Sequence, residues 1–136
     1  MMSKVTLKQQ MHFIGELDGH EINLDADEEF GGMDNGPKPK GLILTALAGC
    51  TAMDVISILR KKRIIPSFFS VSVEASQTET HPKIYENFKI VYSFKGENVT
   101  EDVARRAIDL SLENYCGVAE MLRKVGPIEY EIKIEK

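Results

Sequence analysis

The strongest pattern in the sequence is an apolar stretch over residues 41–59, in which Asp54 is the only charged residue. Pro39 precedes this stretch and a basic run over residues 60–63 follows it, as is usual at the two ends of a helix. The apolar positions run round all sides of the predicted helix. Because a helix that is apolar all round is normally buried, we predict a central helix over residues 39–62 around which the other elements wrap.

Alternation of apolar and polar positions predicts strands before this helix. Residues 4–14 alternate as one half-buried strand, Asp18-Gly19 predicts a hairpin turn, and residues 20–25 form the returning strand. Residues 27–38 contain Gly31-Gly32 and Asn35-Gly36-Pro37, which predict a loop leading into the helix.

Two long strands are predicted after the central helix, over residues 68–78 and 84–95, with a proline-containing connection between them. Thr100 is expected to cap the next helix. The inward positions of that helix are predicted to be Val103, Ala107, Ile108, Leu110 and Leu112. Cys116-Gly117 interrupts it, a short helix follows over residues 118–124, and residues 128–134 alternate as a last strand.

The predicted order of elements is ββ-α-ββ-αα-β. Because the strands come in hairpins rather than in βαβ units, the sheets should be mainly antiparallel and the fold class α+β. With 136 residues, we expect a single domain over residues 1–136, large enough to hold a core without disulfides or metal ions.

Composition narrows the possible partners. The chain is 43% hydrophobic and 28% charged with a net charge of −4, so nothing indicates a nucleic-acid-binding surface. The uncharged run over residues 41–53 is too short to span a membrane, and the N-terminal residues lack the apolar core of a signal peptide. We therefore expect a cytoplasmic protein with no membrane partner, whose two cysteines are reduced at rest.

Common catalytic and metal-binding patterns are missing from the sequence. No metal-ligand spacing links His12, His20 and His81 to each other or to a cysteine, so no metal and no cofactor is predicted. His12 is expected on the exposed face of a strand and His81 in a loop. Acyl-transfer chemistry at Cys50 would need a histidine base, and none is close in sequence.

The remaining candidates are Cys50, in the middle of the central helix, and Cys116, at a helix junction 66 positions later. The two can meet only through the tertiary fold. They are either structural cysteines or a redox pair. In a redox pair, one thiolate attacks the O–O bond of a peroxide and becomes a sulfenic acid, and the other closes a disulfide.

Two stretches carry a resemblance to a known family. TALAGCTAMDVI over residues 45–56 resembles the central helix of the OsmC/Ohr family of thiol peroxidases, and AIDLSLENYCGVAEML over residues 107–122 resembles its second cysteine motif, with Gly117 where the family usually has proline. The resemblance covers essentially the whole chain and implies an intertwined homodimer with active sites at the dimer interface. It implies organic hydroperoxides and a dithiol reductant as substrates, Cys50 as the peroxidatic thiol and Cys116 as the resolving thiol.

The chain departs from the family at the groups that activate the thiol. The family's peroxidases carry an N-terminal arginine and a glutamate before the first cysteine, whereas this chain has no arginine before Arg60. Lys38 or Lys40, supplied by a partner chain, are candidate sources of positive charge, unless both are solvated loop residues. Asp54, one helical turn after Cys50, is a candidate auxiliary residue or an interface hydrogen-bonding group. The alternative function is a non-catalytic, small-molecule-binding or redox-responsive dimer.

Overall fold

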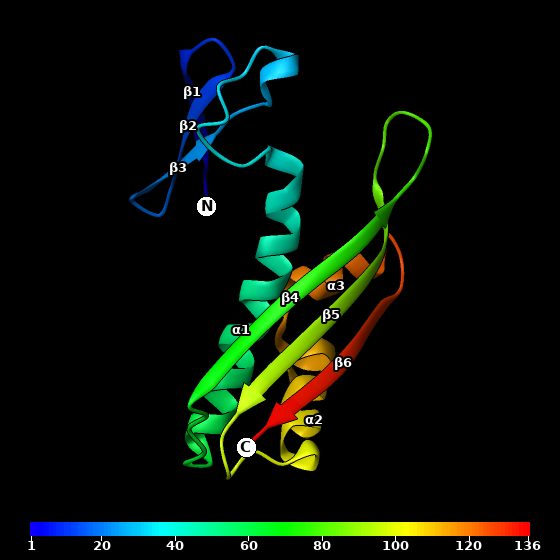
Figure 1. Cartoon of the computed structure of the whole chain (residues 1–136). Coiled ribbons are helices and arrows are strands. Elements are labelled where there is room, and N and C mark those ends of the chain that lie inside the picture. The colour runs from blue at the N-terminus through cyan, green and yellow to red at the C-terminus, as the bar shows by residue number, and fades with distance from the viewer. The chain divides into compact units, whose positions relative to one another are not determined.

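A computed structural model describes residues 1–136, which form two compact units, Met1–Ile43 and Leu44–Lys136 (Figure 1). The first unit is built on a three-stranded antiparallel sheet in the order β1-β2-β3. Its strands are β1 (Lys4–Gln9), β2 (His12–Leu17) and β3 (His20–Leu24).

The prediction of one strand over residues 4–14 is wrong, because the chain turns back at Gln10. Gln10 has a φ of 47° and Gln9 pairs with His12 across the turn, a two-residue hairpin of the kind that needs positive φ. The turn contains neither glycine nor proline, so the alternation runs through it unbroken. The N-terminal order is therefore βββ, and β1 is exposed along its whole length. The turn predicted at Asp18-Gly19 is confirmed, with φ values of 53° and 78°.

The loop after β3 folds around a buried carboxylate. Asp25 accepts hydrogen bonds from the backbone N–H groups of Ala26, Met33 and Asn35, at 2.7, 3.3 and 3.0 Å. Burial opposes ionisation of Asp25, but these backbone donors together hold its pKa below its usual value. His12, expected on an exposed face, is instead buried, and its Nε2 hydrogen-bonds Asn23 Oδ1 at 2.8 Å.

The second unit is a layer of helices on one face of a second three-stranded sheet (Figure 1). Its strands are β4 (Phe68–Gln77), β5 (Tyr85–Lys95) and β6 (Ile128–Glu135), and its helices are α1 (Leu42–Lys61), α2 (Glu101–Leu110) and α3 (Gly117–Arg123). β4 and β5 are antiparallel, whereas β5 and β6 are parallel. The α+β class is confirmed, and three of the four strand pairings in the chain are antiparallel, as expected.

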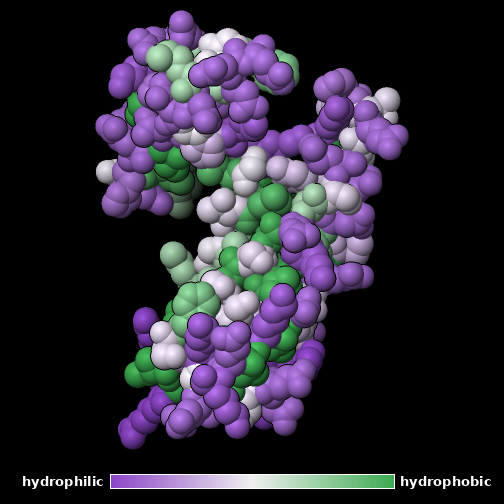
Figure 2. Space-filling model, in the orientation of Figure 1, coloured by the Kyte–Doolittle hydropathy of each residue, from purple (hydrophilic) through white to green (hydrophobic).

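α1 contributes one face to the core. Its fully buried residues recur every four positions, at Leu47, Thr51, Val55 and Leu59, whereas Met53 is 73% exposed. The prediction that this helix is buried on all sides therefore holds for one face only, because a three-stranded sheet and two short helices cover a single side of it. Figure 2 shows hydrophobic residues gathered at the surface where α1 runs.

Two further observations concern the helices. By length and composition alone, the stretch Pro39–Lys61 would suffice to cross a membrane, but it carries residues of the core. Thr100 caps α2 as predicted, its Oγ1 accepting from the N–H of Val103 at 3.3 Å. Leu110, predicted to point inward, is 40% exposed, because it lies beside the buried stripe of α2 instead of within it.

Candidate active site

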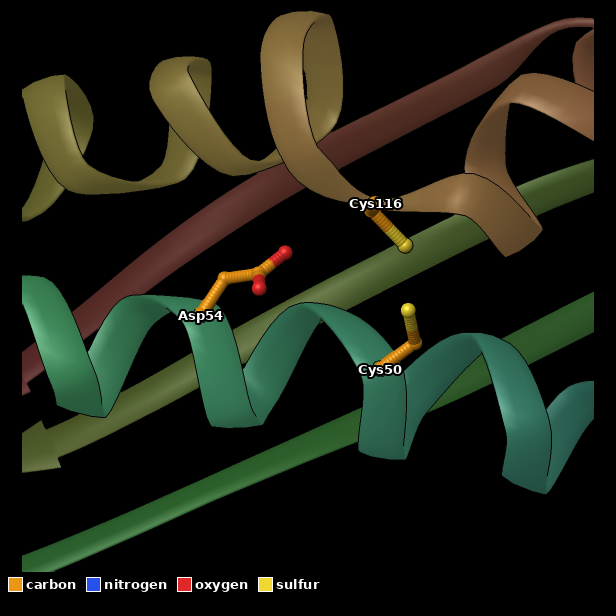
Figure 3. Close-up of side chains that lie close together, drawn as sticks. All are labelled: Cys50, Asp54 and Cys116. Carbon is orange, nitrogen blue, oxygen red and sulfur yellow. The ribbon is translucent and has the colours of Figure 1, made fainter.

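The fold brings together three of the residues singled out from the sequence. Cys50 and Asp54 lie one turn apart on α1, and Cys116 faces them from the start of α3 (Figure 3). The two sulfur atoms and a carboxylate oxygen of Asp54 all lie within 4.8 Å of one another. Both cysteines are free thiols, and their sulfur atoms point toward each other in Figure 3.

A π-helical turn places Cys116 at this position. The turn, Ser111–Tyr115, continues α2, and the N–H of Cys116 donates to the carbonyl of Ser111 at 2.7 Å, five residues back. Turns of this kind are uncommon and occur often at functional sites. Arg123 Nη1 donates to the carbonyl of Leu112 at 2.7 Å, which satisfies a carbonyl within the turn.

Cys116 is buried in the hydrophobic core, and the residue is only 3% exposed. Burial raises the pKa of Cys116 to about 11, and its hydrogen bond with Cys50 and the charge of Asp54 act in the same direction. The N–H of Ala119 donates to Cys116 Sγ at 3.4 Å and opposes this rise in pKa without cancelling it. Cys116 is therefore a protonated thiol at neutral pH, whereas Cys50 is partly accessible to solvent.

A buried chain of hydroxyl groups leads to Asp54. Tyr92 Oη and Thr51 Oγ1 are 2.8 Å apart, Thr51 Oγ1 and Ser111 Oγ are 2.7 Å apart, and Ser111 Oγ donates to Asp54 Oδ2 at 2.8 Å. Because an ionised carboxylate only accepts and each hydroxyl has one proton, the donors run from Tyr92 through Thr51 and Ser111 to Asp54. All three hydroxyl residues are completely buried.

Sequence reasoning missed these three hydroxyl residues. One signal was present: Thr51 is a polar residue next to Cys50 in a largely apolar helix. Nothing in the sequence marks Tyr92 or Ser111, because their pairing with Thr51 depends on how β5 and α2 pack against α1.

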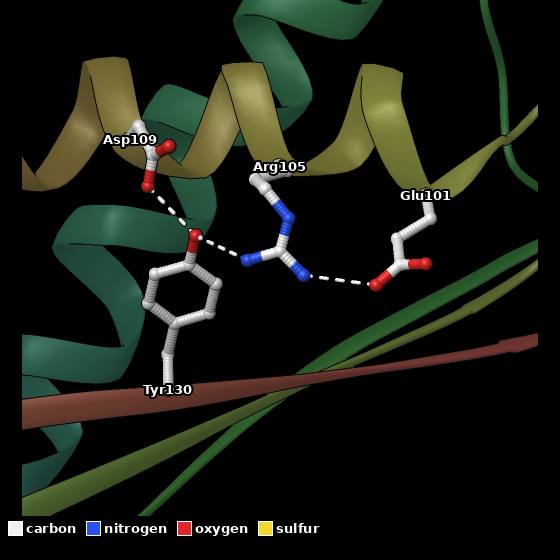
Figure 4. A network of polar contacts seen from close by, with 4 residues as sticks. All are labelled: Glu101, Arg105, Asp109 and Tyr130. Atoms are coloured by element: carbon white, nitrogen blue, oxygen red, sulfur yellow. Dashed lines mark hydrogen bonds and ion pairs between the residues drawn. The ribbon is translucent and has the colours of Figure 1, made fainter.

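A second polar network ties α2 to β6 (Figure 4). Tyr130 Oη donates to Asp109 Oδ1 at 2.7 Å and accepts from Arg105 Nη1 at 3.1 Å, while Arg105 pairs with Glu101 at 2.8 Å. The Tyr130 ring also meets the ring of Tyr92 edge to face, with centroids 5.9 Å apart. The network thus fixes α2, and with it the π-helical turn, against the strand layer that carries Tyr92.

The two candidate lysines belong to the other unit. Lys38 Nζ forms an ion pair with Asp27 Oδ2 at 2.8 Å, and this hydrogen bond raises the pKa of Lys38. Lys40 lies in the short 3₁₀ turn Pro39–Gly41 that precedes α1. The residues that meet in the second unit are therefore Cys50, Asp54 and Cys116, and an activating role for either lysine stays a prediction.

The central helix carries one thiol, and the second thiol faces it from the junction between the π-helical turn and α3. This arrangement is compatible with the family resemblance. The chain belongs to the OsmC-like protein family, whose model matches residues 32–131. This confirms the resemblance found in the two cysteine motifs.

Individual relatives span almost the whole chain. Protein YhfA of Escherichia coli (strain K12) is 31% identical over 135 residues, which cover 98% of each chain. A solved structure of a hypothetical protein from Aquifex aeolicus VF5 is 30% identical with a TM-score of 0.82, covering 99% of this chain and 97% of that one. The organic hydroperoxide resistance protein OhrB of Bacillus subtilis has the same fold, with a TM-score of 0.68, 15% identity and 98% coverage of both chains.

Proposed function

We propose that the protein reduces organic hydroperoxides with Cys50 as the attacking thiol and Cys116 as the resolving thiol. The observation that carries this proposal is the approach of the two sulfur atoms, which are 66 positions apart in sequence yet within 4.8 Å in space. Membership of the OsmC-like family supports it, as does the shared fold with proteins named for organic hydroperoxide resistance.

The reaction proceeds in three balanced steps. The Cys50 sulfur attacks the terminal oxygen of ROOH as its thiol proton is removed, the O–O bond breaks, and the same proton passes to the leaving alkoxide, so that the products are a Cys50 sulfenic acid and the alcohol ROH. The Cys116 sulfur then attacks the sulfenic sulfur, forming the disulfide and releasing water. A dithiol reductant finally exchanges with the disulfide, returning both cysteines to thiols and leaving with its own sulfur atoms oxidised.

We propose that Asp54 accepts the thiol proton of Cys50 and later donates it. The arginine and glutamate that would hold a thiolate in the family's peroxidases are missing from this chain. The proton is therefore best removed as the attack occurs: Asp54 accepts it from Cys50 and returns it to the leaving alkoxide, as a general base and then a general acid. The donor chain ending on Asp54 Oδ2 holds the carboxylate in place for this role.

A homodimer is part of this proposal. The outer face of α1 is rich in apolar residues, and Met53 is largely exposed in the single chain, so a second copy would cover a face that is costly to leave in water. We propose that, in such a dimer, Lys38 or Lys40 of the partner subunit supplies positive charge near the thiols. We expect the dimer to act in the cytoplasm, where thiols are kept reduced.

The second candidate function is a non-catalytic, small-molecule-binding or redox-responsive dimer. The missing arginine and glutamate and the raised pKa of Cys116 favour it. A measurement of peroxide turnover distinguishes the two candidate functions. With cumene hydroperoxide and a dithiol reductant, the peroxidase proposal predicts steady consumption of peroxide that Cys50→Ser abolishes. Consumption that is unchanged in Cys50→Ser would overturn that proposal.

A further inference from the structure

We infer that Cys50, Asp54 and Cys116 form a binding site for a thiophilic divalent cation of the zinc class. The donor atoms are the two sulfur atoms and one carboxylate oxygen, all within 4.8 Å of one another (Figure 3). Donor atoms around a tetrahedral zinc ion lie about 3.3–3.8 Å apart, as follows from Zn–S distances of about 2.3 Å and Zn–O distances of about 2.0–2.2 Å. The donor atoms would need to move about 1 Å closer together to reach the separations found around zinc, and rotation of the side chains can supply this movement.

The backbone supports this geometry from two directions. Cys50 and Asp54 are four residues apart on α1, so their side chains share one face of the helix. The π-helical turn brings Cys116 onto that face from the other side, held by the hydrogen bond from its N–H to the carbonyl of Ser111. No spacing in the sequence reveals this set, because its third member lies 62 positions after Asp54.

The surroundings of Asp54 are those of a metal-binding carboxylate. Carboxylates that bind metal ions are oriented by hydrogen bonds from neighbouring groups, and Ser111 Oγ donates to Asp54 Oδ2. Ser111 is itself held by Thr51, and Thr51 by Tyr92. This buried chain is independent of the sulfur atoms, and it fixes the carboxylate on the side where the two thiols converge.

The donor set selects the class of metal. Thiolate ligands favour zinc and other soft or borderline ions over magnesium and calcium, which prefer all-oxygen sites. Three protein ligands leave a fourth position of a tetrahedral ion for water or another small ligand, as in open rather than closed zinc sites. Because Cys50 and Asp54 are both partly exposed, an ion can enter from their side.

Metal binding goes beyond the proposed peroxidase reaction and competes with it. An ion bound to both sulfur atoms withholds them from peroxide, so zinc should inhibit oxidation of the thiols. The site nevertheless stands without any peroxidase activity, because its evidence is the geometry of the three donors and the hydrogen bonds behind them.

Direct titration tests the site. Reduced full-length protein, treated with a chelator and desalted without oxygen, is titrated with Zn²⁺ by calorimetry and with Co²⁺ by absorption. We expect one ion per chain and thiolate-to-cobalt bands that halve in Cys50→Ser and in Cys116→Ser.

Ser111→Ala should weaken Zn²⁺ binding about 10- to 100-fold by releasing Asp54. Asp54→Asn should also weaken binding, whereas Asp102→Asn, at an exposed carboxylate of α2, should not.

The possible outcomes are separable. Absence of saturable 1:1 binding, or 1:1 binding that is unchanged in Cys50→Ser, Cys116→Ser and Asp54→Asn, would overturn the inference. Circular dichroism of each variant reports folding, and Asp54→Asn leaves both thiols and the side-chain volume in place. Because calorimetry reads binding and not turnover, loss of the metal site and loss of the peroxidase reaction would be recognised separately.

Discussion

Ser111 donates a hydrogen bond to Asp54 over 2.8 Å, joining the π-helical turn that follows α2 to the turn of α1 that follows Cys50. The same hydroxyl pairs with Thr51 at 2.7 Å. One buried side chain therefore connects the helix that carries Cys50 to the segment that ends at Cys116.

Ser111→Ala tests this connection. The change leaves the Asp54 carboxylate and the Thr51 hydroxyl short of one partner each, so we expect the free energy of unfolding in urea to fall by about 1–3 kcal/mol. Oxidation of Cys50 should slow as well, since Asp54 is no longer held. Ser57→Ala, at an exposed position of α1, is the control and should change neither quantity. Equal effects of the two substitutions would contradict the account.

Asp54→Asn keeps the shape of the side chain but removes the proton acceptor. We expect the rate constant for oxidation of Cys50 by cumene hydroperoxide to fall about 100-fold, the lower end of the range for loss of a general base. Stopped-flow measurement against Asp102→Asn provides the comparison. A faster reaction in Asp54→Asn would instead mean that the carboxylate acts mainly by repelling the thiolate.

The raised pKa of Cys116 predicts a pH dependence of stability in reduced, chelator-treated protein. Burial raises the pKa of this thiol from 9.0 to about 11. Above pH 9 the unfolded chain loses the proton while the folded chain keeps it, so the stability contributed by the neutral thiol is complete below pH 9 and is lost as pH rises through about 11. The difference in free energy of unfolding between wild type and Cys116→Ala should therefore shrink from pH 9 to pH 11. A difference that is constant across this range would contradict the assignment.

Gly117 stands where the family resemblance expects proline, and two features of its backbone suit proline. Gly117 is the first residue of α3, a position where proline is favoured. Cys116 has φ −77° and ψ 101°, in the extended region that a residue before proline prefers. Gly117→Pro should raise the free energy of unfolding by about 0.4–1 kcal/mol by restricting the unfolded chain. Gly126→Ala, whose added Cβ would collide with the Glu86 carbonyl, should lower it in the same thermal or urea assay.

Met53 tests the proposed dimer. Its side chain is 73% exposed on the face of α1 opposite the core, and a charge there would be buried if a second copy covers that face. Met53→Glu should convert a dimeric elution volume in gel filtration to a monomeric one. Met121→Glu, at a 62% exposed position of α3, is the matched control. A wild-type protein that elutes as a monomer would remove this part of the proposal.

Most of the second unit could be predicted from the sequence because its signals are local. The central helix, the strands β4, β5 and β6 and the cap at Thr100 all follow from periodicity and end residues, and they appear within a few residues of the predicted bounds. The turn at Gln10 could not be predicted, since its positive φ occurs at a residue with no turn preference. The exposure of one face of α1 could not be predicted either. The sequence shows that this face is apolar, but it does not show whether the same chain or a second copy covers it.

The candidate site, like the fold, could be predicted only in part. Cys50, Asp54 and Cys116 were identified from two motifs and a helical spacing, and the structure brings them together. The chain of Tyr92, Thr51 and Ser111 was missed, because a buried hydroxyl in a strand or helix has no sequence signature until its partner is known.

Stopped-flow oxidation of the reduced protein by an organic hydroperoxide, followed by mass measurement and thiol counting, tests the central claim most directly. The account predicts rapid loss of two thiols per chain, no such loss in Cys50→Ser, and arrest at one sulfenic acid in Cys116→Ser. Slow oxidation that proceeds equally in wild type and Cys50→Ser would contradict it, and would leave the facing thiols as a binding site without peroxidase chemistry.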